Sequence, residues 1–335
     1  MPTTTPVFPV NAPFNTDPAY SGSFIPTLWS KKLLIKFYQN LMLSEIVNTD
    51  YEGELKNQGD TVRIRSVPDV TIRKYEIGNN LQYEVPTPIF QDMVVDQGNY
   101  FGVKVNDVLA YQSDMDLMNM FTSEASKQMR LAVEEEVFYH SFVTSGPAPE
   151  NEGHSAGAMS GEYDLGTDTT PIEHSNPDNI LNAIFRMSAA LDEQDVPPDD
   201  RWLLMSPYHR HILLQSDIAA SFFSGDSSSI VRTGKIGRID RFTTYVSNLL
   251  PFGAAGKALV SGRGKPSEAP DLPGAKRRSL MVAGTKHAIS FAATIDKTEP
   301  IRSQTDFGDI VRGLMVYGRK VVKPEAMTIA VIGAN

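Results

Sequence analysis

The chain has 335 residues, of which 41% are hydrophobic, 9% aromatic and 21% charged, a composition typical of a globular protein with about two or three domains. Its 31 Lys and Arg residues against 40 Asp and Glu residues give a formal net charge of -9, which argues against generic nucleic-acid binding. The absence of cysteine excludes disulfides, thiolate metal sites and cysteine nucleophiles. No apolar run reaches the length of a membrane span, and residues 1–26 lack the pattern of a signal peptide, so a soluble protein made in a cytoplasm is expected.

The N-terminal region is expected to form an extended arm followed by a helix. Residues 1–27 contain six prolines separated by Thr, Asn and Ser residues, which favours an extended chain. Thr27 is a suitable N-cap for an amphipathic helix that ends at about Asn48. Its periodic apolar positions are Leu28, Trp29, Leu33, Leu34, Phe37, Leu41 and Ile46. Such a helix needs a partner surface.

A long two-stranded excursion is predicted over residues 51–106. Apolar residues alternate with polar ones from Val62 to Ile72, and the turn-forming sequence Gly78-Asn79-Asn80 follows. A second pair of strands is predicted over 89–95 and 100–105. An isolated ribbon of this kind is marginal in water, so we expect it to lie on another subunit.

The clearest helix is predicted from Met115 to about Val143, with a length of roughly 43 Å. Its Met and aromatic side chains are interpreted as core. Its acidic cluster, which resembles half of a carboxylate–histidine metal site, is interpreted as a solvated face because no second such helix is present. The cluster consists of Glu134, Glu135, Glu136 and His140. Residues 145–176 are expected to form a surface loop or short hairpin.

The remaining chain alternates helices and strands, which indicates an α/β subdomain within an α+β protein. Asn176-Pro177-Asp178 starts a helix and Val196-Pro197-Pro198 stops it. Another helix begins at Pro207, and a polar loop covers 221–233. Strands are predicted over 201–205, 242–246, 258–261, 280–283, 309–322 and 327–332.

Sequence motifs for nucleotide chemistry are absent. The segments 253–258 and 262–265 have the wrong spacing for a phosphate-binding loop and no hydroxyl residue after the lysine. Neither a dinucleotide-binding glycine pattern nor a nucleophile elbow occurs. We therefore expect no cofactor and no enzymatic activity.

Two further groups resemble metal or acid–base sites. His209 and His211 would lie about 200° apart on a helix and would not chelate one ion, so they are interpreted as solvent or interface residues. Asp199 and Asp200 follow two prolines and are interpreted as turn residues. No catalytic or metal-ligating residue is predicted.

Basic residues gather in the predicted hairpin and at Lys276-Arg277-Arg278. They would suit phosphates or acidic patches of a neighbouring subunit, and the acidic chain as a whole favours the second interpretation. The candidate intersubunit contact residues are Arg63, Arg65, Arg73, Lys74 and Tyr75.

This order of elements resembles that of the HK97-type major capsid proteins of tailed bacteriophages. Several stretches are also similar to the coat proteins of short-tailed, T7-like phages. These stretches are Val196 to Arg201, the helix after Ser206-Pro207-Tyr208, Gly237 to Pro251, and Gly318 to Ala326.

The resemblance implies the HK97-like capsid fold, divided into five segments. They are an N-terminal arm and helix (1–50), an E-loop hairpin (51–106), a peripheral domain with a long spine helix (107–175), an α/β axial domain (176–284), and return strands with the C-terminus (285–335). It also implies a structural function, in which hexamers and pentamers close into an icosahedral shell that encloses double-stranded DNA without sequence-specific binding.

The partners implied by the resemblance are copies of the chain, a scaffolding protein, a portal protein and, as an open case, a decoration protein. The implied location is the virion capsid, assembled in the host bacterial cytoplasm. Residues 1–27 are too short for a cleaved scaffolding region, so a separate scaffolding protein is expected. Covalent crosslinking through Lys56 or Lys74 is not expected.

Three alternatives remain open at this point. An encapsulin-like cellular shell would share the fold and enclose a cargo enzyme. A soluble enzyme would need a polar pocket that no motif indicates. A monomeric binding module would leave the hairpin and the Pro-rich arm without anything to pack on.

Overall fold

The computed structural model describes residues 41–51, 61–68, 70–78, 80–107, 117–215, 237–254, 259, 277–304 and 306–333. Several predicted segments lie outside these residues, namely the arm, most of the first helix, the polar loop 221–233 and Lys276. Of the strand predicted over 258–261, only Leu259 is described, and it does not belong to a strand.

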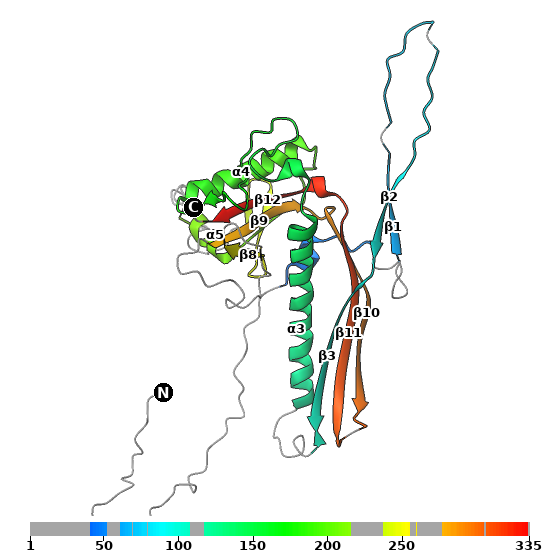
Figure 1. The fold of residues 1–335 in the computed structure, drawn as a ribbon, viewed down its shortest axis with the longest axis vertical. Coiled ribbons are helices and arrows are strands. Elements are labelled where there is room, and N and C mark those ends of the chain that lie inside the picture. Colours follow the sequence, from blue (N-terminus) through cyan, green and yellow to red (C-terminus); the bar gives the residue numbers. More distant parts are fainter. Residues whose placement is uncertain are drawn as a thin grey trace, which may run out of the picture. The chain divides into compact units, whose positions relative to one another are not determined.

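The described residues form a mixed α and β structure (Figure 1). The helices are α1 (Leu43–Ile46), α3 (Leu117–Tyr139), α4 (Pro177–Glu193) and α5 (Pro207–Leu213), with a π-helical turn at His140–Ser145 and 3₁₀ turns at Pro149–Asn151 and Pro324–Ala326. The strands are β1 (Thr61–Ser66), β2 (Ile89–Val94), β3 (Gln97–Asn106), β4 (Ile172–Glu173), β5 (Arg201–Met205), β6 (Arg238–Ile239), β7 (Phe242–Val246), β8 (Phe252–Ala254), β9 (Arg277–Thr285), β10 (Ile289–Arg302), β11 (Gly308–Val321) and β12 (Met327–Gly333).

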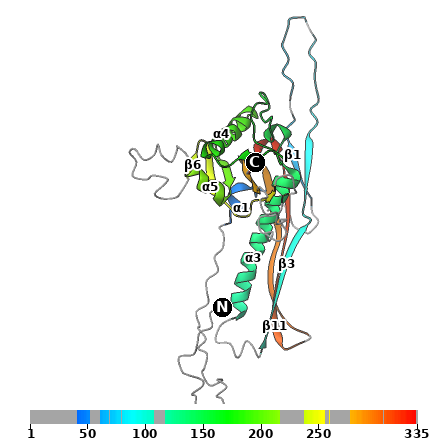
Figure 2. The same cartoon turned by 60° about the vertical axis from the view of Figure 1, so that its left-hand side comes forward.

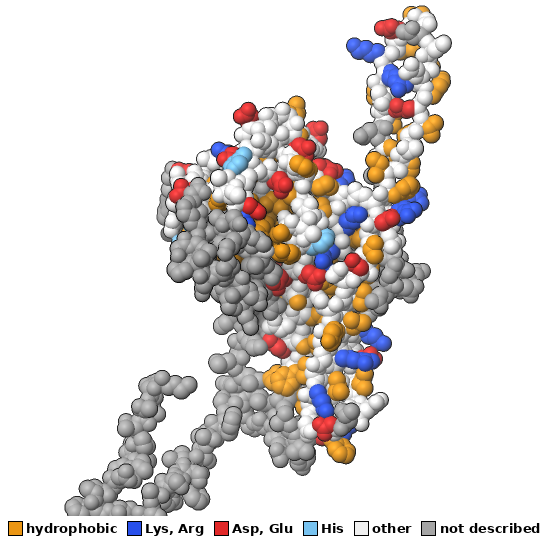
Figure 3. Space-filling model, viewed as in Figure 1, with side chains coloured by type: hydrophobic (Ala, Val, Ile, Leu, Met, Phe, Trp, Pro, Cys, Tyr) orange, Lys and Arg blue, Asp and Glu red, His pale blue; other side chains and the backbone are white. Residues whose placement is uncertain are grey.

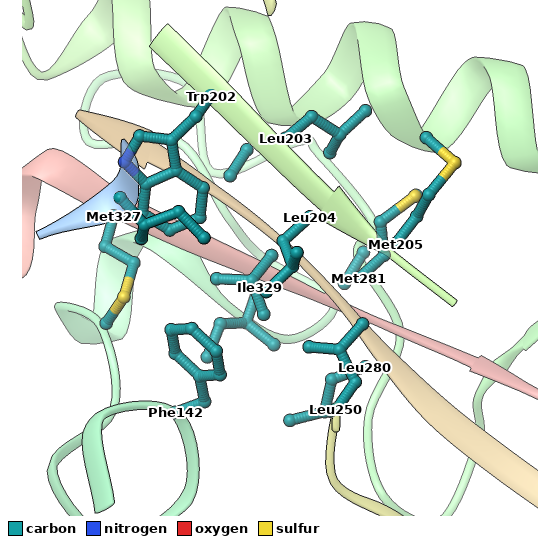
Figure 4. Close-up of a cluster of buried hydrophobic side chains, with 14 of the residues drawn as sticks. Phe142, Trp202, Leu203, Leu204, Met205, Leu250, Leu280, Met281, Met327 and Ile329 are labelled. Carbon is teal, nitrogen blue, oxygen red and sulfur yellow. The ribbon is translucent and has the colours of Figure 1, made fainter. Parts of the chain in front are cut away.

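A seven-stranded sheet carries most of the core. Its order is β4-β12-β9-β5-β7-β6, with β8 paired to β9. The central strands β5 and β12 are buried along their whole length, which explains why they are continuous apolar runs rather than alternating ones. Figure 4 shows Leu204 of β5 among Ile329, Leu280 and Leu250, which come from three other segments of the chain.

The predicted helices of this region and the strands predicted over 201–205, 242–246, 280–283 and 327–332 are confirmed, with small shifts at their ends. The short strands β4, β6 and β8 were not predicted. Helix α4 begins where the sequence indicated, because the side chain of Asn176 accepts a hydrogen bond from the backbone N–H of Asp178 at 3.0 Å. Helix α5 begins at Pro207 with Ser206 as its cap. One strand of the C-terminal region was missed: β10 contains Pro300 and charged residues near its end, which weaken its strand pattern.

A three-stranded antiparallel sheet, β10-β11-β3, lies beside helix α3 (Figure 2). The helix has 23 residues, about 34 Å at 1.5 Å per residue, so the prediction of a long helix is confirmed. Val133, Val137 and Phe138 are buried in its C-terminal half. The core interpretation is wrong for Phe121 in the N-terminal half, which is 37% exposed.

The hairpin differs from the predicted excursion in its pairing. Strands β1 and β2 pair antiparallel, from Thr61 with Val94 to Ser66 with Ile89. Strand β3, expected to pair within the excursion, pairs instead with β11. Residues 67–88, called the hairpin tip below, contain no strand among their described residues, although a strand was expected at Val70 and Ile72.

The base of the hairpin has a small core of its own. Val62 and Ile64 of β1 belong to a buried cluster with residues of β2, β10 and β11. The buried members of this cluster are Val62, Ile64, Met93, Val95, Ala292 and Val316. The alternating pattern of β1 therefore buries one face, as its sequence indicated. The burial ends where the tip begins.

The first described helix is shorter than expected. Helix α1 covers only Leu43–Ile46, and Leu41 and Met42 before it are not helical. The prediction of one continuous helix through these residues to Asn48 is wrong at this end. Asn48 instead forms a parallel bridge with Ser290 of β10.

Candidate subunit interface

The five predicted contact residues all lie on the hairpin. Arg63 and Arg65 are exposed on β1, while Arg73, Lys74 and Tyr75 are exposed in the hairpin tip. Tyr75 is 73% exposed. The sequence therefore identified an exposed part of the molecule, and its contact with a neighbour stays a prediction.

Arg63 is satisfied within the hairpin. Its Nε donates to Asp92 Oδ1 on β2 at 2.9 Å, and its guanidinium lies 5.6 Å from the centroid of the Phe90 ring. The hydrogen bond raises the pKa of Arg63 and lowers the pKa of Asp92. The pair fastens the two strands across a directly opposed position of the ladder.

Arg73 is satisfied in a similar way. Its Nη1 donates to the backbone oxygen of Gln82 at 3.1 Å, and its Nη2 lies 3.6 Å from Glu84 Oε2. The backbone N–H of Thr71 donates to the same carboxylate at 2.6 Å. These contacts join the two sides of the tip, so Arg73 has carboxylate and carbonyl partners without a neighbouring subunit.

The opposite side chains of the tip are apolar and have no cover from the described residues. Successive side chains of an extended chain point to opposite faces, so Val70, Ile72, Leu81, Tyr83 and Val85 fall on the face opposite Arg73 and Glu84. Val67, Tyr75 and Ile77 fall by the same alternation on the face of Arg73. The exposed apolar residues of the tip are Val67, Val70, Ile72, Tyr75, Ile77, Leu81, Tyr83 and Val85, with Ile72 91% and Ile77 95% exposed. Figure 3 shows hydrophobic side chains along this part of the molecule. A contiguous apolar face of this kind marks an interaction surface.

The three-stranded sheet has a second exposed apolar position. Tyr100 on β3 and Leu314 on β11 are directly opposed in the ladder, with exposures of 83% and 40%. Gly102 follows Tyr100 on the same face, and a Cβ built there would meet nothing within 4 Å. This sheet face therefore has a protruding ring with open space beside it.

The interpretation of the acidic cluster of α3 as a solvated face is wrong for Glu134. Glu134 is fully buried, and its carboxylate accepts hydrogen bonds from the backbone N–H groups of Met42 and Leu43. Glu136 accepts from Tyr317 Oη at 2.6 Å and from Arg319 Nη1 at 2.8 Å. Both carboxylates hold α3 to other segments of the chain.

The positions expected for Arg278 and His209 are also wrong. Arg278, expected to face a neighbouring subunit, is buried and forms an ion pair with Asp168 of its own chain. His209, expected at a solvent or interface position, is buried with its Nε2 2.9 Å from Ser279 Oγ. Burial lowers the pKa of His209 to about 4.

Asp199 and Asp200 are exposed turn residues, as interpreted, and Asp200 has a positive φ of 56°. Within the described part of the chain, no group of three or more His, Cys, Asp or Glu residues is arranged to hold a metal ion. No described helix is long and apolar enough to cross a membrane.

The comparison with protein families decides what this architecture belongs to. A family model described as phage capsid protein matches residues 93–330. The chain belongs to this phage capsid protein family. It is a major capsid protein with the HK97-like fold, a structural subunit of the virion that forms the icosahedral capsid shell with copies of itself.

Solved structures with the same fold come from several phages. A chain of Mycobacterium phage Che8 is 22% identical, with a TM-score of 0.68 over 93% of this chain and 97% of that one. The capsid structure of the cyanophage P-SCSP1u is 14% identical, with a TM-score of 0.67 over 93% and 94% of the two chains. The mature capsid of bacteriophage PhiM1 is 15% identical, with a TM-score of 0.58 over 95% and 99%.

A search among curated proteins finds no match. The family match favours the phage capsid over the encapsulin-like alternative. The closer resemblance to T7-like phages receives no support from these comparisons and stays a prediction.

Proposed function

We propose that the capsid protein forms hexamers and pentamers whose subunits are joined by the hairpin tip. The observation that carries this proposal is the apolar face of the tip, which has no cover from the described residues of its own chain. Exposed apolar area of this kind is stabilised by burial, at about 25 cal/mol per Å². A second copy of the chain is the partner that a capsid subunit meets on every side.

The apolar face of the tip is the main contact in this proposal, and the basic residues have a supporting role. Arg63 and Arg73 already have partners in the hairpin, so they stiffen the ribbon that carries the apolar face. Arg65, Lys74 and Tyr75 are the members of the predicted set that we assign to the neighbouring subunit. On that neighbour, the sheet face around Tyr100 and Leu314 offers an exposed apolar surface.

The predicted domain division is retained as a proposal with one change. The E-loop hairpin is best limited to 51–96, because β3 pairs with β11 and so belongs with the peripheral domain. Helix α3 is the proposed spine helix of that domain. The seven-stranded sheet, which includes β12, is the proposed axial domain.

The further partners are also proposals. They are a separate scaffolding protein, a portal protein and a decoration protein, with double-stranded DNA enclosed without sequence-specific binding. The net charge of -9 supports a shell that does not hold its genome tightly. We propose assembly in the cytoplasm of a host bacterium, with a structural role that needs neither a cofactor nor a catalytic residue.

The first experiment is electron microscopy of the full-length chain, produced with and without a candidate scaffolding protein. Closed shells or rings of subunits are expected. Tyr83→Arg places a charge on the apolar face, and Gln82→Arg, its matched control, places the same charge on the opposite face. Burying an unpaired charge costs several kcal/mol, so Tyr83→Arg is expected to reduce shells by at least about tenfold.

Equal loss of shells in both variants would contradict a role for the apolar face. A homogeneous monomer or dimer under both conditions, with hairpin amides protected from hydrogen exchange, would contradict hairpin-mediated assembly as a whole. Hydrogen exchange in the shell is expected to show the tip protected, because its amides become covered only in the assembly.

A further inference from the structure

Glu134 has an unusual position for a carboxylate. It lies on α3, is fully buried, and accepts hydrogen bonds from two backbone N–H groups that are 92 and 91 residues away in the chain. Met42 N lies 3.2 Å from Oε1 and 3.0 Å from Oε2, and Leu43 N lies 3.2 Å from Oε2. Both groups are at the start of α1, where a helix has N–H groups without acceptors of its own. Glu134 therefore caps α1 from another element.

The surroundings of this carboxylate are mostly apolar. A cavity of about 250 Å³ lies beside it, and its lining includes Leu41, Leu43, Val133, Phe291 and Met315. Burial raises the pKa of Glu134 to about 7, against a smaller lowering by the N–H groups of Leu43 and Met42.

Charged side chains from the neighbouring segments do not cause the raised pKa of Glu134. Arg130 lies one turn earlier on α3 and lines the same cavity. Glu45 on α1 is 3.9 Å from Lys286, and Glu136 on α3 is bonded to Arg319. None of these five side chains is a cause of the raised pKa of Glu134. The dominant influence on its protonation is therefore removal from water.

The segment that Glu134 holds is attached at its other end by contacts that do not titrate. Asn48 N donates to Ile289 O at 2.8 Å, and Phe291 N donates to Asn48 O at 2.9 Å. These are backbone bonds to β10. Proton uptake can therefore change the attachment of residues 41–47 at the Glu134 end without changing it at the β10 end.

We propose that docking of residues 41–47 onto helix α3 is coupled to protonation of Glu134, so that this attachment is firm in acid and loosens as the solution becomes alkaline. When the segment leaves, water reaches the carboxyl group and its pKa returns toward the ordinary value of 4.5. The docked state thus binds the proton more tightly, and its advantage declines as the pH rises from 4.5 through 7. Between pH 5 and pH 9 the ratio of docked to released states is expected to fall roughly 50- to 100-fold.

The test is hydrogen exchange on the full-length chain between pH 5 and pH 9, with each rate divided by its intrinsic rate at that pH. Protection of the amides of residues 42–47 is expected to fall by the stated factor. Glu134→Gln keeps an acceptor oxygen and cannot ionise, so its protection is expected to be independent of pH. Glu135→Gln, the matched control on the same helix, is expected to behave as the unchanged chain.

Constant protection in the unchanged chain would overturn the proposal, as would a pH dependence that survives in Glu134→Gln. If Glu134→Gln does not fold, titration of the Glu134 carboxyl carbon by NMR in the unchanged chain gives the decision. A midpoint near 7 supports the coupling, and a midpoint near 4.5 overturns it. These measurements are made on the subunit, so they do not depend on whether the hairpin mediates assembly.

Discussion

The seven-stranded sheet and the hairpin tip contain similar apolar side chains in opposite environments. Leu203 and Leu204 on β5 are 0% exposed, whereas Ile72 and Ile77 in the tip are 91% and 95% exposed. The sheet is covered within its own chain by α4, and α5 contacts it through His209 and Ser279 of β9. The comparison teaches that the stability of the subunit and the stability of its assembly depend on different groups of residues.

The largest difference in the free energy of unfolding is expected between alanine variants of two arginines, Arg201 on β5 and Arg63 in the hairpin. Arg201 is buried, and its guanidinium donates to Pro197 O at 2.9 Å and to Asp192 Oδ1 at 2.8 Å. Arg201→Ala should lower the free energy of unfolding by about 3 to 5 kcal/mol, because the buried carbonyl acceptors lose their donor and the large buried side chain leaves a cavity. Asp192 is partly exposed and keeps its ion pair with Arg241. Urea unfolding of the subunit measures this. Arg63→Ala, which breaks an exposed pair, is the control and should leave the unfolding midpoint unchanged.

A second comparison uses one leucine from each region. Leu203→Ala in the seven-stranded sheet should lower the free energy of unfolding by about 3 kcal/mol, through lost burial and the cavity that remains. Leu81→Ala in the tip, where the side chain is 62% exposed, should change it by less than about 0.5 kcal/mol. Urea unfolding gives both values. Equal effects would mean that the tip packs on its own subunit.

The smallest of the three expected changes in the free energy of unfolding comes from pH, through the buried His209 on α5. The pKa of His209 is lowered to about 4 by burial, below its ordinary value of 6.5, so the unfolded chain binds more protons between these values. Stability should therefore fall as the pH drops from 6.5 toward 4, by about 2 kcal/mol at pH 5. Thermal unfolding from pH 8 to pH 5 measures this loss.

The controls are two histidine variants on the same helix. His209→Gln should remove this part of the pH dependence, and His211→Gln, at an exposed position, should retain it. A pH dependence that is unchanged in His209→Gln would mean that another group titrates.

Much of the fold follows from local sequence patterns. Helix α4 has a cap, a proline in its first turn and periodic apolar residues, and it begins where these predict. The strands β5 and β12 are short apolar runs, and each was placed correctly to within a residue. The long helix α3 was also predicted, since its polar and apolar positions repeat over many turns. Each of these signals lies within a few residues of the element it defines.

The candidate interface residues lie on an exposed hairpin, and their contact with a neighbouring subunit stays a prediction. The alternation from Val62 to Ile72 identified a ribbon, and the basic residues on it suggested ionic contacts. The structure pairs Arg63 and Arg73 within the ribbon and leaves the apolar face uncovered by the described residues. The sequence could not indicate this, because the partners Asp92 and Gln82 become neighbours only when the hairpin closes.

By itself, the sequence determined the elements whose signals are local: the two long helices, the buried strands and the alternating ribbon. Only the tertiary structure decided which distant segments meet. It paired β3 with β11, buried Glu134 against Met42, and joined Arg278 to Asp168. The physical reason is that a charged side chain looks the same in sequence whether water or a distant backbone group satisfies it, and burial is set by the packing of the whole chain.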